Sequence, residues 1–104
     1  MGSYRSRLDI IADILLVASR NAKKTQIMYQ ANLSYKVLKR YLAEIVEASL
    51  IHFEGEKQCY TLTSKGQEFL EAYKQYSRTN KHVEKRLKDV RTKRKVLEDL
   101  CSNK

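Results

Sequence analysis

The sequence predicts a mainly α-helical chain with one small β-hairpin and a single long helix at its C-terminal end. Three observations indicate this fold class. Apolar residues recur at three- and four-residue spacing through the first half of the 104-residue chain. Apolar and polar residues alternate on either side of Gly55. A stretch without proline then runs from Thr63 to the C-terminus, and the chain is long enough for only one hydrophobic core.

The first helix is predicted over residues 5–20, with Ser3 as a start signal and Asp9 in an early turn. Its apolar face consists of Leu8, Ile11, Ile14, Leu15 and Ala18. Thr25 is the expected N-cap of a short second helix over residues 26–31, which buries Ile27 and Met28. Asn32 tolerates left-handed backbone angles, so Asn32 and Leu33 are expected to form a tight turn.

The third helix is predicted to begin after the N-cap Ser34 and to end near Ala48. Its periodicity directs Leu38, Leu42, Ile45 and Val46 inward, whereas Lys36, Lys39, Arg40, Ala43 and Glu47 share the opposite face. Two strands follow. Ile51 and Phe53 alternate with polar residues before the turn Glu54–Lys57, and Tyr60 and Leu62 alternate after it, which is typical of a β-hairpin.

The last helix, capped by Thr63 or Ser64, carries a heptad pattern of the coiled-coil type. The a positions hold Tyr73, Asn80, Leu87, Arg94 and Cys101, and the d positions hold Phe69, Tyr76, Val83, Val90 and Leu97. A parallel dimer in register would place the two Arg94 side chains together, so an antiparallel homodimer is predicted, with its two-fold axis between Lys85 and Asp89. The alternative is one long helix packed on its own domain.

The net charge of +9 favours a polyanionic partner such as DNA. Catalysis is not expected, since His52 and His82 are the only histidines, the three glycines form no phosphate-binding loop, and no metal-ligand spacing is present. No metal, cofactor or small-molecule ligand is therefore predicted. The chain lacks an apolar run that could span a membrane, and it does not begin like a signal peptide, so a cytoplasmic, nucleoid-associated protein is expected. Cys59 and Cys101 are interpreted as structural, reduced thiols.

The predicted order of helix, helix, turn, helix and hairpin is that of the winged helix-turn-helix, in which the third helix enters the major groove of DNA. Side chains of types that bond phosphates and base edges gather near the start of that helix. The predicted DNA-binding residues are Lys23, Lys24, Ser34, Tyr35, Lys36, Lys39, Arg40 and, in the wing, Lys57. Residues 67–104 carry a net charge of +5 and are the rival DNA surface.

Two segments, "KKTQIMYQANLSYKVLKRYLAEIVEASLI" and "YTLTSKGQEFLE", resemble the small archaeal winged-helix DNA-binding proteins of the Sulfolobus ten-kilodalton class. The resemblance covers nearly the whole chain, and "IMYQANLSYKVLKRYL" is its most specific part. It implies a homodimer held by an antiparallel coiled coil, with a winged helix at each end and an architectural role in bending, bridging or compacting DNA. The acidic wing turn departs from this picture and puts the wing's contribution in doubt.

These observations predict a DNA-binding domain over residues 1–68 and a dimerisation helix over residues 69–104. The predicted interface consists of Tyr73, Tyr76, Asn80, Val83, Leu87, Val90, Arg94, Leu97 and Cys101. The expected function is a dimeric, largely sequence-independent architectural DNA-binding protein, because phosphate-directed cations outnumber candidate base-contacting residues. The alternatives are a sequence-specific transcription regulator and, from a different class, a coiled-coil adaptor that binds protein.

Overall fold

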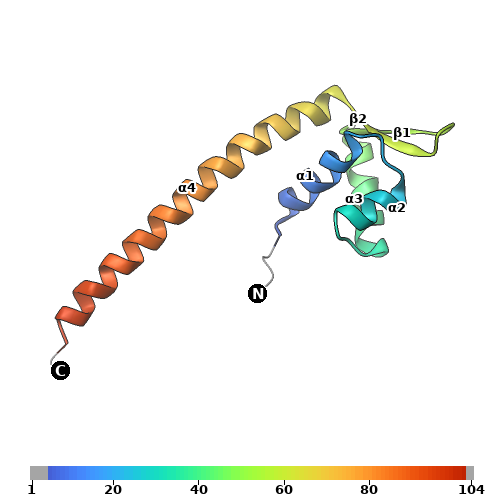
Figure 1. The fold of residues 1–104 in the computed structure, drawn as a ribbon. Helices are drawn as coiled ribbons and strands as arrows, with labels where there is room; N and C mark the ends of the chain where they lie inside the picture. Colours follow the sequence, from blue (N-terminus) through green and yellow to red (C-terminus); the bar gives the residue numbers. More distant parts are fainter. Residues whose placement is uncertain (1–4, 103–104) are drawn as a thin grey trace. The chain divides into compact units, whose positions relative to one another are not determined.

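The computed structural model of the chain describes residues 5–102. Over this range the elements follow the predicted order, with three short helices, an antiparallel hairpin and one long helix (Figure 1). Their bounds are α1 Arg7–Ala18, α2 Lys24–Gln30, α3 Tyr35–Glu47, β1 Ile51–Glu54, β2 Cys59–Leu62 and α4 Ser64–Leu100. The mainly helical fold class with one small hairpin is thereby confirmed.

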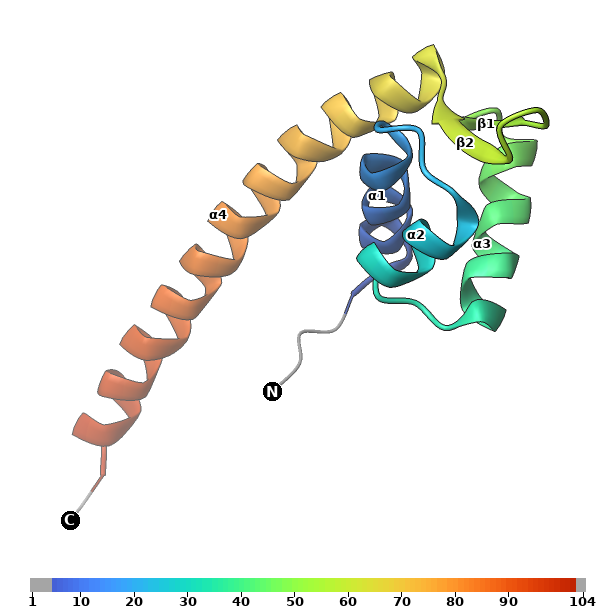
Figure 2. The same cartoon turned by 45° about the vertical axis from the view of Figure 1, so that its right-hand side comes forward.

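The chain divides into two compact units, Met1–Tyr73 and Lys74–Lys104. The first unit holds α1, α2, α3, the hairpin and the opening turns of α4. In it the three short helices pack together and the hairpin joins at the C-terminal end of α3 (Figure 2). The second unit contains the remainder of α4, which ends at Leu100. Only the first unit therefore contains the hydrophobic core.

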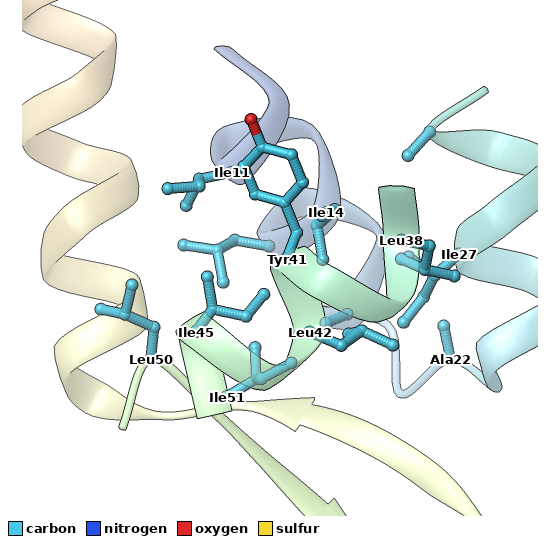
Figure 3. Packing of buried hydrophobic residues seen from close by; sticks show 13 residues of the cluster. Ile11, Ile14, Ala22, Ile27, Leu38, Tyr41, Leu42, Ile45, Leu50 and Ile51 are labelled. Atoms are coloured by element: carbon cyan, nitrogen blue, oxygen red, sulfur yellow. The ribbon is translucent and has the colours of Figure 1, made fainter. Parts of the chain in front are cut away.

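The core forms where the apolar faces of α1, α2 and α3 meet (Figure 3). Its largest fully buried side chains are Ile14, Leu15, Ile27, Leu38, Ile45 and Ile51. Tyr41 is also buried, at 8% exposure, although the helical periodicity did not single it out. Burial of a side chain of this size stabilises the fold by about 1.5–3 kcal/mol, so this shared core is what holds α3 in place.

Two helix starts differ from the sequence prediction. Ser3 lies outside the described residues, and Ser6 is the N-cap of α1: its hydroxyl accepts from the Asp9 backbone N–H, and the Asp9 carboxylate accepts from the Ser6 N–H. Thr25 was the wrong N-cap for α2. The cap is Lys23, whose backbone N–H donates to Gln26 Oε1 at 3.0 Å, so α2 begins and ends earlier than predicted.

The turn between α2 and α3 follows the prediction. Asn32 has a φ of 54°, in the left-handed region that Asn tolerates, and Leu33 packs partly buried against the core. Arg5 secures this turn from outside, because its guanidinium donates to the backbone oxygens of Ala31 at 2.6 Å and Asn32 at 2.8 Å. Arg5 also pairs with Asp13 of α1 at 2.8 Å, which ties the turn to the first helix.

The hairpin pairs Ile51 with Leu62 and Phe53 with Tyr60. The rings of Phe53 and Tyr60 lie 5.0 Å apart, a separation typical of favourable aromatic contacts. Ala22, between α1 and α2, adds a bridge to the hairpin: its N–H donates to the Tyr60 oxygen at 3.1 Å and its oxygen accepts from the Tyr60 N–H at 2.8 Å. The hairpin is thus anchored by the loop that leads into α2.

The start of α4 is fixed by Thr63, whose hydroxyl accepts from the Gly66 N–H at 3.0 Å and donates to the Ser49 oxygen at 2.6 Å. Gly66 is buried because the helix approaches the Leu50 backbone closely there. Further along α4, Phe69 packs partly buried against the core and stacks on Tyr73, with ring centroids 6.4 Å apart. These contacts bind the opening turns of α4 to the first unit.

Two predicted inward positions are wrong. Leu8 of α1 is 38% exposed and Val46 of α3 is 39% exposed. Both sit at correct helical spacing, but at the margin of the apolar stripe. A three- and four-residue pattern identifies the side of a helix that faces the core, whereas the width of the covered stripe depends on the neighbouring elements.

From Lys74 onward, α4 exposes most of the predicted interface. Val83, Leu87, Val90 and Leu97 are between 47% and 64% exposed in the single chain. Asn80, Arg94 and Cys101 are exposed as well, and Arg94 Nε lies 3.4 Å from Glu98 Oε2 one turn along. The heptad face is therefore available to a partner, and pairing between copies stays a prediction.

Candidate nucleic-acid interface

The outward face of α3 carries the cations that the sequence singled out. Leu38, Tyr41, Leu42 and Ile45 are buried, which directs Lys36, Lys39 and Arg40 to solvent. Ser34 occupies the N-cap, where its Oγ accepts from the Val37 N–H at 3.2 Å and keeps its own hydroxyl hydrogen free to donate. The first turns of α3 thus present a cap hydroxyl and three cations outward.

Helix α2 contributes to the same surface through Lys24. Its ammonium lies 4.8 Å from the centroid of the Tyr35 ring and donates to the Tyr35 hydroxyl at 3.4 Å. Tyr35 is 54% exposed, so this cation–π contact lies open to solvent. The predicted residues Lys24 and Tyr35, eleven positions apart in the sequence, are therefore brought together at the start of α3.

A hollow of about 330 Å³ lies between α2, α3 and the hairpin. Lys24 and Lys39 line it together with Leu42, Ala43, Val46, Phe53 and Tyr60. Val46 and Phe53 are each about two-fifths exposed, so the floor of the hollow is apolar while two cations stand in its lining. No pattern in the sequence predicts this hollow, because it depends on how the hairpin packs against α3.

The acidic end of α3 is electrostatically compensated. Glu44 forms an ion pair with Arg7 of α1, and the Lys65 ammonium donates to the Ala48 backbone oxygen at 2.7 Å. Glu47 is exposed near the C-terminal end of the helix. The positive charge of α3 is therefore concentrated in its first half, where free N–H groups also favour anions.

The wing offers less positive charge than the helices. The turn between β1 and β2 consists of residues 55–58, where Glu56 and Lys57 are both exposed, and Glu54 is the last residue of β1. Gln58 has a φ of 53°, and its side-chain amide donates to the Gly55 oxygen at 2.7 Å. Lys57 thus stands in the hairpin turn, apart from the cations of α2 and α3 in the chain and beside two acids.

The remaining predicted residue, Lys23, is exposed at the N-cap of α2. Tyr29 of α2, which was not among the predicted residues, is 82% exposed and is the most exposed large aromatic side chain in the described part of the chain. Tyr29 could have been recognised in the sequence as a large aromatic residue two positions after Ile27, off the apolar side of the helix that Ile27 buries. An exposed tyrosine hydroxyl can donate to a phosphate oxygen.

The histidines and cysteines of the chain differ in exposure. His52 and His82 are exposed on β1 and α4, as expected of surface histidines, while Cys59 is a buried free thiol and Cys101 an exposed one. Among residues 5–102, His, Cys, Asp and Glu form no group placed to hold a metal ion. In the same range no helix is long and apolar enough to cross a membrane.

Comparison with known proteins bears on this arrangement. A family model described as winged helix-turn-helix matches residues 4–81. The chain belongs to the winged helix-turn-helix family. The matched range covers α1 to β2 and about the first half of α4, so in this winged helix-turn-helix protein α3 is the helix that corresponds to the DNA-contacting element of the motif.

Two known proteins are similar to this chain. The winged helix-turn-helix chain is similar to the crystal structure of Sso10a-2, a DNA-binding protein from Sulfolobus solfataricus, with a TM-score of 0.68 and 19% identity over 96% of this chain and 100% of the other. It is also 38% identical over 68 residues, 64% of its length, to the uncharacterized protein MJ0290 of Methanocaldococcus jannaschii. The matched segment spans 31% of MJ0290, about a third of that protein.

Proposed function

We propose that the chain binds double-stranded DNA, with α3 in the major groove and α2 against the sugar–phosphate backbone. The observation that carries this proposal is the exposed cationic first half of α3, formed by Lys36, Lys39 and Arg40, with Lys24 of α2 beside it. A winged helix-turn-helix places these positions against DNA. The likeness in fold to Sso10a-2, a DNA-binding protein, supports the same choice.

The contacts favour phosphates over base edges. Lys23, Lys24 and the hydroxyls of Tyr29 and Ser34 are groups that bond phosphate oxygens without reading sequence. On α3, the groove-facing helix, the cationic side chains are confined to the short stretch from Lys36 to Arg40. The role proposed is therefore architectural, with binding to many sequences, and the wing contributes little because Lys57 is accompanied by two acids.

We further propose that two copies pair through the heptad face of α4. In this arrangement residues 1–68 bind DNA and residues 69–104 dimerise. Exposed Val83, Leu87 and Val90 lose apolar surface from water on pairing. The helices run antiparallel, since parallel strands in register would oppose the two Arg94 guanidinium groups at one a position. A Cys101–Cys101 disulfide that forms readily in the dimer would show parallel strands.

Tyr73, one of the predicted interface residues, also makes contacts within its own chain. Its hydroxyl donates to Asp9 Oδ1 in the same chain, and its ring stacks on Phe69. The contact with Asp9 anchors the root of the dimerisation helix to α1. We therefore expect Tyr73 to act mainly within its own chain and the contacts from Tyr76 onward to decide pairing.

The DNA proposal is tested by reversing charge on α3. Lys39→Glu with Arg40→Glu should leave folding and dimerisation nearly unchanged, because neither side chain is buried. Affinity for duplex DNA should fall at least about 100-fold at physiological salt, and the slope of log affinity against log salt should flatten by about one unit per lost phosphate contact. Fluorescence anisotropy on two unrelated duplexes measures both quantities.

The same titrations separate the alternatives. Affinity that falls steeply with salt on both duplexes supports the architectural protein. Affinity retained on one sequence alone supports a sequence-specific regulator, and absence of binding to either duplex supports a protein-binding adaptor. Near-native affinity of the double variant would refute the placement of α3 on DNA.

A further inference from the structure

The exposed side of α4 away from the heptad face carries a second periodic pattern, made of cations. Steps of four and three residues connect Lys74, Arg78, Lys81, Lys85, Lys88, Thr92 and Lys95. Every member except Thr92 is basic, and all seven side chains belong to exposed residues. We call the six cations of this series the basic ridge. At 100° per residue the ridge lies about 150° around the helix from the a and d positions, so pairing through those positions leaves it open.

The ridge lies in the segment that carries nearly all of the net charge of the protein. Residues 74–95 contain ten Lys and Arg against two Asp and Glu, a net charge of +8, while the whole chain carries +9. The ridge residues form no ion pair among residues 5–102; the one ion pair found in this part of α4 is Arg94 with Glu98. Within the described residues, ion pairs therefore do not neutralise the charge of the ridge.

The arrangement costs the helix stability. Like charges three and four residues apart repel each other on a helix, and the ridge repeats this spacing between Lys74 and Arg78, and again between Lys81, Lys85 and Lys88. A face that served only for solubility would be expected to alternate signs, as exposed coiled-coil positions commonly do. A row of cations without an acidic member fits a polyanion that lies along the helix.

The size of the row matches a duplex. From Lys74 to Lys95 the helix advances about 32 Å at 1.5 Å per residue, close to one turn of DNA at about 34 to 36 Å. Lysine is a compact charge on a flexible stem, suited to phosphate oxygens and indifferent to base sequence. No aromatic side chain belongs to the ridge, which disfavours stacking on unpaired bases.

We propose that the basic ridge is a second binding surface, separate from α3, for the sugar–phosphate backbone of double-stranded nucleic acid. The ridge adds affinity without sequence preference and lets the coil itself hold a duplex segment. It does not depend on the role of α3, because the cations belong to another element and another face.

The test uses the full chain with α3 already disabled by Lys39→Glu and Arg40→Glu. In that background a long duplex should still bind weakly, and Lys81→Gln, Lys85→Gln and Lys88→Gln together should lower the salt slope by about two to three units, since each phosphate contact contributes about 0.9. An unchanged salt slope would refute the proposal that the basic ridge binds the duplex. Sedimentation velocity on each variant checks that pairing is intact.

A matched pair of substitutions separates position from bulk charge. Thr92→Lys completes the row, whereas Thr79→Lys adds the same charge about 120° around the helix from it, at an exposed site. The ridge predicts a gain in affinity of several-fold and a steeper slope for Thr92→Lys alone, and equal effects of the two variants would refute it. Ridge substitutions that weaken binding to vesicles containing phosphatidylserine while leaving DNA affinity unchanged would instead assign the surface to lipid.

These outcomes are distinguishable from failure of the winged helix. If α3 does not bind DNA, the Lys39 and Arg40 reversal leaves affinity near native and the ridge variants alone lower it. If the ridge does not bind, the α3 reversal alone abolishes binding and the ridge variants change nothing further. Full binding that requires both sets of cations shows two surfaces on one chain.

Discussion

Replacing Gly66 by alanine should have two opposing effects on the stability of the fold, and they differ in size. Gly66 lies in the first turn of α4, where helix propensity alone would favour alanine by about 1 kcal/mol. A methyl group there would lie 2.6 Å from Leu62 Cδ1 and 3.2 Å from the Leu50 carbonyl carbon, and closer still to the Leu50 carbonyl oxygen. These separations are well inside van der Waals contact, and the Leu50 atoms belong to the backbone, which cannot rotate away as a side chain can.

The steric clash should outweigh the gain in helix propensity. Overpacking of a buried site costs about 1–3 kcal/mol, and backbone clashes lie at the upper end of that range. After the gain in propensity is subtracted, Gly66→Ala should destabilise the fold by about 2 kcal/mol. The shift should appear in the urea midpoint with an unchanged m value, measured at one fixed protein concentration because the chain is expected to pair.

Gly55 in the hairpin turn provides the matched control. A methyl group built there meets no atom within 4 Å, so Gly55→Ala should change stability by less than about 0.5 kcal/mol. If Gly66→Ala proves as stable as the wild type or more so, helix propensity dominates and the close approach of α4 to Leu50 is refuted.

Two further predictions concern the contact of Tyr73 in α4 with α1 and the heptad face of α4. The pKa of Asp9 is held below its ordinary value of 3.8, mainly by the Tyr73 hydroxyl and then by the Ser6 backbone N–H. A lowered carboxyl pKa stabilises the fold above that ordinary value, so Tyr73→Phe should cost about 1 kcal/mol at neutral pH. This difference should vanish as the pH falls through the lowered pKa, and a difference that persists under acid would contradict the bond. Leu87→Asp should raise the dimer Kd at least about 100-fold in sedimentation equilibrium, since an unpaired buried carboxylate costs about 3 kcal/mol or more. Gln75→Asp, which lies away from the heptad face, should leave the dimer Kd unchanged. Equal effects of the two substitutions on the Kd would argue against pairing through the heptad face.

The elements of this chain were predictable because their signals are local. Ser34 caps α3 as predicted, since an N-cap hydroxyl and the N–H it accepts from are three residues apart. The exposed cations of α3 followed from helical periodicity, which fixes relative direction once one side is apolar. The turn at Asn32 followed from the backbone angles that asparagine tolerates. The N-cap of α2 could not be predicted from residue type, because Lys23 caps through its backbone and not through its side chain.

The order of the elements, the polarity of α3 and the heptad and basic faces of α4 can be predicted from the sequence, because each depends on spacing within one element. The tertiary structure was needed to establish which side chains meet across elements. It showed Gly66 to be a point of close approach, where the sequence offered only a weak position in a helix. It joined Tyr73 to Asp9 across 64 residues and seated Lys24 on Tyr35. Such contacts depend on how separate elements pack against the shared core. The periodicity within one element carries no information about that packing.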